Sequence, residues 1–200
     1  MDRRVFKILL AVTGSAGARH TPNLVKALLE INQPYKFEVR VVVTENAKHF
    51  FELTELPPTA LVYDDSAEWA WRQYGDPVVH IELRNWADVV VIAPLDANSL
   101  AKLALGICDN LLTTTIRAMD LTKPLLFCPT MNDVMWNHPI TQIHINTLKS
   151  WGLKEVPPIV KLAMCGEIGM GGIPTVETIV NEIKIICGNI THFAVLDQRP

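Results

Sequence analysis

Apolar runs rich in β-branched residues alternate along this chain with segments whose apolar positions recur at helical spacing. The apolar runs predict strands at residues 5–13, 37–43, 88–93 and 124–128. The helical segments are residues 22–30, 46–51, 98–105, 111–118, 139–151 and 176–187. The run at 88–93 does not alternate, which is typical of a strand buried on both faces of a parallel sheet. The order predicts βαβ units with right-handed crossovers and an α/β fold with a mostly parallel sheet.

Two stretches show neither periodicity. Residues 55–76 hold a pair of prolines and a group of aromatic side chains, and residues 156–174 hold another proline pair and four glycines. Stretches of the second kind are commonly lids or binding loops, and a disordered surface loop is the alternative. We predict a single domain over residues 1–200, with a Gly-rich substrate lid near 156–174.

Composition excludes several classes of protein. With 49% hydrophobic and 20% charged residues, the 200-residue chain resembles an ordinary globular domain. A net charge of −3 without a basic patch argues against nucleic acid, and no run approaches the roughly 18 apolar residues of a membrane span. Residues 5–12 form a short apolar run with a lysine, so they predict a first strand rather than a signal peptide. Four distant cysteines without CxxC spacing suit a reducing compartment, so we predict a cytoplasmic protein.

Small and polar residues follow three of the predicted strands. Gly14 and Ser15 follow the first, Thr44 follows the second, and Asp96, Ala97, Asn98 and Ser99 follow the third. Small residues let a backbone approach a ligand, and the free N–H groups of a following helix attract an anion. The first turn lacks GxGxxG spacing, so it favours a mononucleotide phosphate over a dinucleotide. Tight turns and helix caps without a ligand are the alternative.

The segment 129–136 follows the fourth strand. Its Asn132 offers two hydrogen-bond donors and one acceptor. Met131 and Met135 have flexible, polarizable side chains that suit the wall of a binding site. Ligands of open α/β sheets bind beyond the carboxyl ends of strands, where this segment lies. A turn and a helix start, with Asn132 as the cap and the Met and Trp side chains in the core, is the alternative.

Two further residues are candidates for acid–base work. His80 stands alone among apolar neighbours, where a histidine is more often structural. Cys165 precedes Gly166 in the glycine-rich stretch, and a cysteine in a mobile loop can deliver a proton or a thiolate. The six histidines show no metal-ligand spacing, so no metal is predicted.

Five motifs in the same order resemble the homo-oligomeric flavin-containing cysteine decarboxylases. They are residues 80–84 (HIELR), 93–100 (APLDANSL), 106–113 (GICDNLLT), 129–136 (PTMNDVMW) and 161–166 (KLAMCG). The segment 129–136 matches the family's substrate motif PxMNxxMW, and 161–166 matches its catalytic-cysteine loop. The resemblance extends over almost the whole chain.

The resemblance implies a flavodoxin-like, Rossmann-like three-layer sandwich that binds FMN and forms a homotrimer with active sites between subunits. FMN would be held by Gly14, Ser15, Thr44, Asp96, Ala97, Asn98 and Ser99. The substrate would be bound by Asn132 at its carboxylate, with Met131, Met135 and Arg84. His80 would serve the oxidative decarboxylation and Cys165 would be the proton donor of the reductive half.

The implied reaction converts 4′-phosphopantothenoylcysteine to 4′-phosphopantetheine in coenzyme A biosynthesis. Loss of CO2 from a cysteine carboxyl needs an electron sink that side chains do not supply, so a cofactor must. In the family the thiol is oxidised to a thioaldehyde, CO2 leaves, and the ene-thiolate is reduced and protonated. A thiol with a pKa of about 8.5 is mostly protonated at pH 7, which suits Cys165 as the acid.

Three rival functions share the fold. An oxidative decarboxylase of peptidyl cysteine has no need of the Cys165 step, and a flavin prenyltransferase does not match PxMNxxMW with Cys165. A halotolerance-type, phosphatase-inhibitory subunit commonly lacks part of the catalytic set or carries acidic extensions. The chain departs from the family pattern at Asn85, where a second Arg is frequent, and at Thr130, where Ala is usual.

Overall fold

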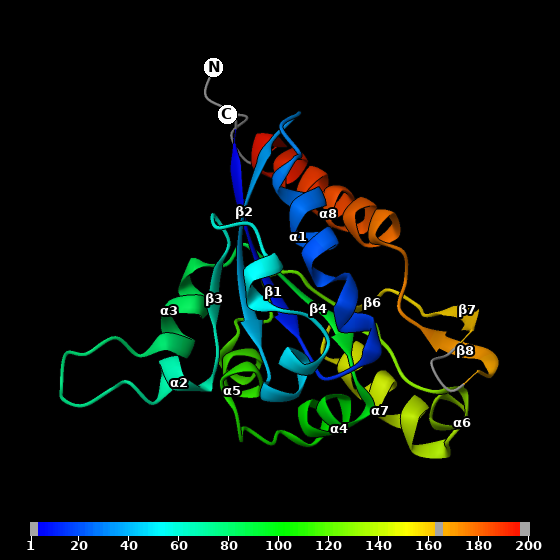
Figure 1. Cartoon of the computed structure of the whole chain (residues 1–200). Helices are drawn as coiled ribbons and strands as arrows, with labels where there is room; N and C mark the ends of the chain where they lie inside the picture. The colour runs from blue at the N-terminus through cyan, green and yellow to red at the C-terminus, as the bar shows by residue number, and fades with distance from the viewer. Residues whose placement is uncertain (1–3, 163–165, 197–200) are drawn as a thin grey trace.

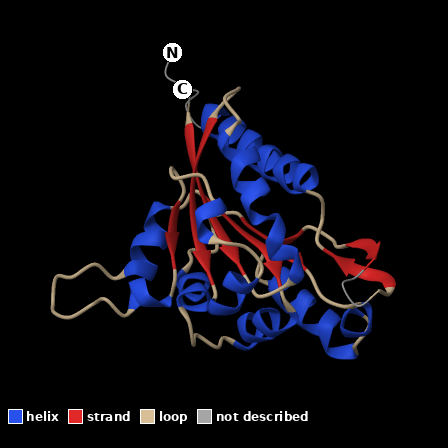
Figure 2. Ribbon diagram, in the orientation of Figure 1, coloured by secondary structure: helices blue, strands red, loops and turns tan. Residues whose placement is uncertain are grey.

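The sheet is the centre of the structure, a computed structural model that describes residues 4–162 and 166–196 (Figures 1 and 2). Its strands are β1 (Val5–Val12), β2 (Lys36–Val43), β3 (Leu61–Tyr63), β4 (Val89–Leu95), β5 (Leu125–Pro129) and β6 (Lys154–Glu155). They pair in the order β3-β2-β1-β4-β5-β6, and every pair is parallel. The predicted strands are confirmed. The sequence pattern missed β3 and β6, which are too short to show periodicity.

Helices cover both faces of this sheet. The α-helices are α1 (Thr21–Leu29), α2 (Asp65–Glu68), α3 (Val79–Trp86), α4 (Ala97–Leu105), α5 (Leu111–Ala118), α6 (Asp133–Trp136), α7 (Pro139–Ser150) and α8 (Val176–Leu196). Three 3₁₀ helices, η1 (Ala16–His20), η2 (Glu45–His49) and η3 (Leu53–Glu55), follow strand ends or connect elements in the described chain. The predicted helices are confirmed, with residues 46–51 forming the 3₁₀ helix η2. The segments α2 and α3 were not predicted, and α6 agrees with the alternative in which Asn132 caps a helix.

The alternation along β1 explains the layers. Ile8 and Leu10 belong to a core cluster with residues of α1 and α8, whereas Leu9 and Ala11 belong to a second cluster with residues of α3, α4, α5 and α7. Successive side chains of a strand point to opposite faces, so one strand contributes to both cores. All residues of β4 are buried, as the non-alternating run predicted. The predicted three-layer sandwich is therefore confirmed.

Residues 156–174 contain more regular structure than their sequence indicates. β7 (Ile159–Leu162) and β8 (Ile168–Gly172) form an antiparallel pair beside α6, past the edge of the main sheet (Figure 1). The glycines of β8 permit close packing, because a Cβ at Gly169 would clash with Asp133 and one at Gly171 would clash with the Met131 carbonyl oxygen. The alternative of a disordered surface loop therefore does not hold for the residues that form β7 and β8.

Residues 55–76 are divided between β3, α2 and an extended loop. This loop leads from α2 to α3 and projects from the body of the subunit (Figure 1). Its aromatic side chains are exposed, with Trp69 at 77% and Trp71 at 51%. None of the described helices combines the length and apolarity needed to cross a membrane.

Candidate active site

The order of the strands reverses between β1 and β4, and the crevice at such a point is where open α/β sheets bind ligands. Thr13, fully buried, ties the two strand ends together there. Its Oγ1 donates to the Pro94 carbonyl oxygen at 3.0 Å and accepts from the Asp96 backbone N–H at 2.7 Å. This contact places the turns after β1 and β4 side by side. Thr13 is the last residue of the predicted strand 5–13, but only the sheet order reveals its bridging role.

The turn after β1 is closed by small residues. Ser15 Oγ accepts from the Gly17 backbone N–H at 3.3 Å, which starts η1. A Cβ at Gly14 would lie 2.5 Å from the Cβ of Asn46 in η2, so a side chain there would separate the ends of β1 and β2. Gly14 is therefore required by the close approach of these two turns.

Thr44 and Asp96 complete this edge. The Oγ1 atom of Thr44 is buried and has no hydrogen-bond partner in the described structure. Such an atom is costly unless a group from outside the chain satisfies it. Asp96 caps α4 by accepting from the Ser99 backbone N–H at 2.6 Å, and Asn98 is exposed beside it. The sheet thus gathers Gly14, Ser15, Thr44, Asp96, Ala97, Asn98 and Ser99 at the ends of β1, β2 and β4.

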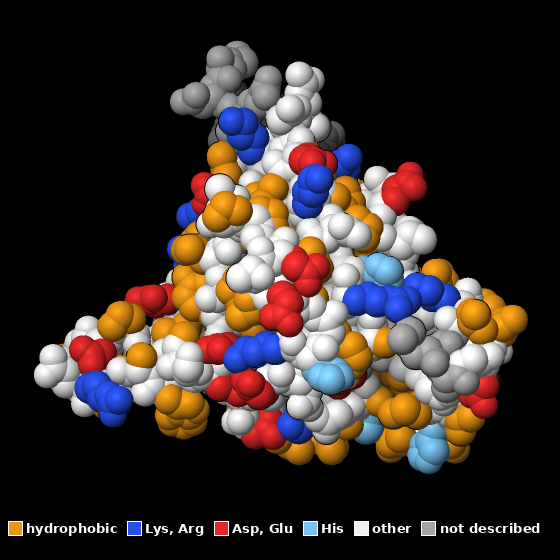
Figure 3. All heavy atoms as spheres, in the orientation of Figure 1, with side chains coloured by type: hydrophobic (Ala, Val, Ile, Leu, Met, Phe, Trp, Pro, Cys, Tyr) orange, Lys and Arg blue, Asp and Glu red, His pale blue; other side chains and the backbone are white. Residues whose placement is uncertain are grey.

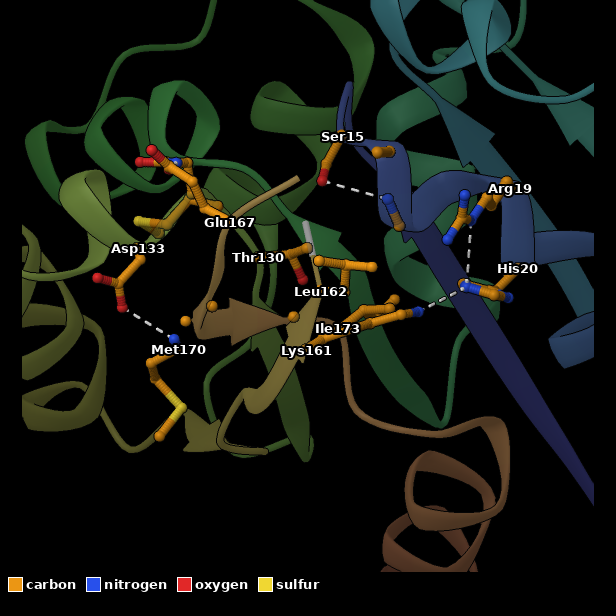
Figure 4. A pocket seen from close by; sticks show the side chains of 17 residues that line it. Ser15, Arg19, His20, Thr130, Asp133, Lys161, Leu162, Glu167, Met170 and Ile173 are labelled. Carbon is orange, nitrogen blue, oxygen red and sulfur yellow. Dashed lines mark hydrogen bonds between the residues drawn. The ribbon is translucent and has the colours of Figure 1, made fainter. Parts of the chain in front are cut away.

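A cavity of about 310 Å³ adjoins this edge (Figure 4). It lies between the β1–α1 turn, the segment after β5 and the β7–β8 hairpin, and Ser15, Met131 and Asn132 are among its lining residues. Asn132 caps α6, since its Oδ1 accepts from the Val134 N–H at 2.8 Å and the Met135 N–H at 3.4 Å. Its Nδ2 donates to Glu167 Oε2 at 3.2 Å. Asn132 is therefore both a helix cap and a cavity residue.

Two other residues of this segment differ in burial: Thr130 is buried and Met135 is exposed. Thr130 is buried; its N–H donates to the Leu95 carbonyl oxygen at 2.8 Å and its Oγ1 to the Cys128 carbonyl oxygen at 3.1 Å. Met135 is 48% exposed and does not line the cavity.

His80 and Arg84 are placed elsewhere. Both lie on α3, which Figure 1 shows across the subunit from the hairpin, and neither lines the cavity. His80 Nδ1 lies 2.5 Å from Glu68 Oε1, and the His80 backbone N–H donates to Glu68 Oε2 at 3.2 Å. The Arg84 carbonyl oxygen accepts from Lys123 Nζ at 2.9 Å. Within the described chain, His80 therefore does not line the cavity that holds Asn132. Glu68, twelve positions from His80, had no sequence signal.

The described cysteines are a solvent-exposed Cys108 and two core thiols. Burial raises the pKa of Cys128 far above its usual value and raises that of Cys187 to about 12, so neither is reactive. Cys165 lies outside the described residues. Within residues 4–162 and 166–196 no three His, Cys, Asp or Glu side chains form a group able to hold a metal ion.

Comparison with known proteins adds to this geometry. A family model described as Flavoprotein matches residues 1–187. Phosphopantothenoylcysteine decarboxylase of Mus musculus is 49% identical over 186 residues, which cover 92% of this chain and 89% of the mouse protein. A solved mutant of PPC decarboxylase complexed with pantothenoylaminoethenethiol is 44% identical with a TM-score of 0.88, covering 92% of this chain and all (100%) of that one. The FMN binding protein AtHal3 is 45% identical with a TM-score of 0.83, covering 91% and 96% of the two chains.

Proposed function

The chain belongs to the Flavoprotein family, and we propose that it is an FMN-dependent phosphopantothenoylcysteine decarboxylase acting in coenzyme A biosynthesis. It removes CO2 from 4′-phosphopantothenoylcysteine and yields 4′-phosphopantetheine. The observation that carries the proposal is the cavity at Asn132, which opens beside an edge of small and polar residues suited to a mononucleotide.

FMN fits the residues at the ends of β1, β2 and β4. The buried Thr44 hydroxyl lacks a partner within the described chain and would gain one from the cofactor. Gly14 and Ser15 lie at the start of η1, and the exposed Asn98 and the buried Ser99 lie in the first turn of α4, so both turns bring small polar residues to this edge. We assign cofactor binding to these residues together with Asp96 and Ala97. When bound, FMN supplies the two-electron oxidation of the substrate thiol and later returns the electrons, so the reaction has no net redox change.

Asn132 orients the substrate. Its Oδ1 is engaged by the first turn of α6, which fixes the direction of the amide and leaves Nδ2 on the cavity side with Glu167. A donor held in this way suits the substrate carboxylate, which accepts hydrogen bonds. Met131 forms part of the apolar wall of the cavity. A charged carboxylate is costly beside an apolar wall, so its conversion to neutral CO2 is favoured there.

His80 acts on the proton of the substrate thiol. An ionised Glu68 can only accept hydrogen bonds, so the proton of the imidazole resides on Nδ1 and Nε2 is available as a base. This use of His80 requires a site shared between subunits, because α3 does not reach the cavity of its own chain. We therefore propose a homotrimer in which α3 of one subunit, with Arg84, completes the cavity of the next. The exposed side chains of Trp69, Trp71 and Met135 supply apolar surface for such contacts.

Cys165 is proposed as the acid that protonates carbon in the second half-reaction. The β7–β8 hairpin that flanks it in sequence forms one wall of the cavity, and we propose that this hairpin is the substrate lid of a single-domain enzyme. A cytoplasmic location is proposed as well, in keeping with the free thiols of Cys108, Cys128 and Cys187.

Product analysis tests the function. FMN-loaded protein supplied with 4′-phosphopantothenoylcysteine should release CO2 and form 4′-phosphopantetheine, both followed by mass spectrometry of the quenched reaction. Cys165→Ser should release CO2 but accumulate an oxidised product two mass units lighter, because a serine hydroxyl is a far weaker acid than a thiol. Formation of the oxidised product by the wild-type enzyme would instead indicate an oxidative decarboxylase, and an absence of CO2 would contradict the proposal.

A further inference from the structure

Three basic side chains meet at one end of the cavity. Arg19 and His20 come from η1, and Lys161 comes from β7, 141 positions away from His20. Lys161 Nζ lies 3.4 Å from His20 Nε2, and Arg19 Nε donates to the same nitrogen at 3.4 Å. Figure 4 shows the three side chains converging, and Figure 3 shows Lys and Arg side chains gathered beside the hairpin. We call Arg19, His20 and Lys161 the basic corner.

The cavity is polarised by charge. The basic corner lies at one end, and Asp133 and Glu167 lie at the other (Figure 4). The acidic pair is engaged by its own side: Asp133 Oδ1 accepts from the Met170 N–H at 2.8 Å, and Glu167 accepts from Asn132. These contacts hold the carboxylates near Asn132, away from the basic corner. The field at the basic corner therefore favours an anion.

His20 responds to its two neighbours. Burial is the largest cause that lowers its pKa, followed by repulsion from Lys161 and from Arg19. The guanidinium of Arg19 and the ammonium of Lys161 both contact the same nitrogen of the neutral His20 ring. His20 therefore brings two positive charges close together without neutralising either of them. An anion with several acceptor oxygens would match this arrangement better than a single carboxylate, since it can accept from the guanidinium of Arg19 and the ammonium of Lys161 at once.

Resting on the proposed function, we propose that the basic corner binds the 4′-phosphate of the substrate and makes the enzyme select phosphorylated over unphosphorylated pantothenoylcysteine. The substrate carries a carboxylate at one end and a phosphate at the other. With the carboxylate at Asn132, the phosphate is directed to the opposite end of the same cavity. The cofactor has its own edge at β1, β2 and β4, whereas Lys161 belongs to the hairpin.

The test compares two substrates on the FMN-loaded enzyme. 4′-Phosphopantothenoylcysteine and pantothenoylcysteine differ only in the phosphate. For Arg19→Ala and Lys161→Ala, kcat/KM with the phosphorylated substrate should fall about 10- to 100-fold, the effect of losing one charge-assisted hydrogen bond. With pantothenoylcysteine it should change by less than about twofold, because that substrate offers no phosphate for either side chain to bind. Lys161→Arg should retain selectivity, and Lys26→Ala, an exposed lysine of α1 outside the cavity, is the matched control.

Two further readouts keep the outcomes separate. The visible spectrum of bound flavin should be unchanged in both variants; loss of flavin would mean that the basic corner serves the cofactor phosphate and would overturn the proposal. Equal losses with both substrates would overturn it too. If wild-type enzyme decarboxylated neither substrate, the proposed function would fail. Calorimetry with 4′-phosphopantetheine and pantetheine would still show whether the basic corner binds a phosphate. Equal affinity of wild-type protein for these two ligands would contradict a phosphate site.

Discussion

Both carboxylate oxygens of Glu68 contact His80. One oxygen lies 2.5 Å from the ring Nδ1 and the other accepts from the His80 backbone N–H at 3.2 Å. The two contacts join the end of α2 to the first turn of α3, which has no side-chain cap of its own. The contact at Nδ1 sets the tautomer and the direction of the imidazole, and the contact with the backbone N–H holds the carboxylate in place.

Glu68→Gln tests this relationship. Glutamine keeps one acceptor oxygen, but its amide cannot accept the second hydrogen bond. We expect kcat to fall about 10- to 100-fold with little change in KM, as for partners that orient a reacting group. Nitrogen NMR of the His80 ring should change from a single tautomer to a mixture. The matched control is Glu82→Gln on an exposed position of the same helix, and an unaltered ring signal in Glu68→Gln would refute the orienting role.

Thr44→Val separates cofactor binding from stability. Valine has nearly the same shape, and the Thr44 hydroxyl has no protein partner to lose, so the cofactor-free protein should be as stable or more stable, by up to about 1 kcal/mol. FMN affinity should fall about 10-fold, as expected for one lost hydrogen bond. Calorimetry and urea unfolding measure the two effects. Thr13→Val is the contrast: that hydroxyl joins β1 to β4, so stability should drop. A less stable Thr44→Val protein would show that its hydroxyl serves the fold.

A shared site predicts complementation between two inactive variants. His80→Asn and Asn132→Asp should each be inactive alone, yet a refolded equal mixture should regain up to about a quarter of wild-type activity, because one site in four then pairs an intact His80 with an intact Asn132 across a cyclic interface. Native mass spectrometry verifies the mixed assemblies. Their complete inactivity would place both residues in one subunit's site.

Acid stability depends on Asp64. Its hydrogen bond to Lys48 Nζ, at 2.6 Å, is the main cause that lowers the Asp64 pKa from 3.8 to about 2. A carboxyl with a depressed pKa in the folded state adds stability that is fully present above pH 3.8 and is lost as the pH falls towards 2. Lys48→Met should therefore lower the unfolding free energy by about 1 kcal/mol at pH 7, after allowance for solvent screening. Urea titrations from pH 7 to pH 2 should show the difference from wild type shrinking; a constant difference would exclude the ion pair as its source.

The periodicity of the chain was sufficient to predict its longest elements. Non-alternating β4 had to be buried on both faces, and the alternation in β1 had to serve two cores, because strand geometry turns a local pattern into a burial pattern. The cofactor edge could also be anticipated, since Gly14, Thr44 and Asp96 each lie within two residues of a strand end and parallel strands present their carboxyl ends together. Short elements such as β3 and α2 offered too few residues for a period to be detected.

The sequence by itself determined the kinds of residue available and the strand ends that carry them. Only the tertiary structure decided which of these residues meet. Glu68 reaches His80 across twelve positions, and Lys161 reaches His20 across 141, because the folding of a loop and of a hairpin sets those distances. The glycines of β8 illustrate the same division: their number was visible in the sequence, but the need for them arises from the carbonyl oxygen of Met131 and the side chain of Asp133. Contacts of this kind depend on where two segments pack, which no local pattern records.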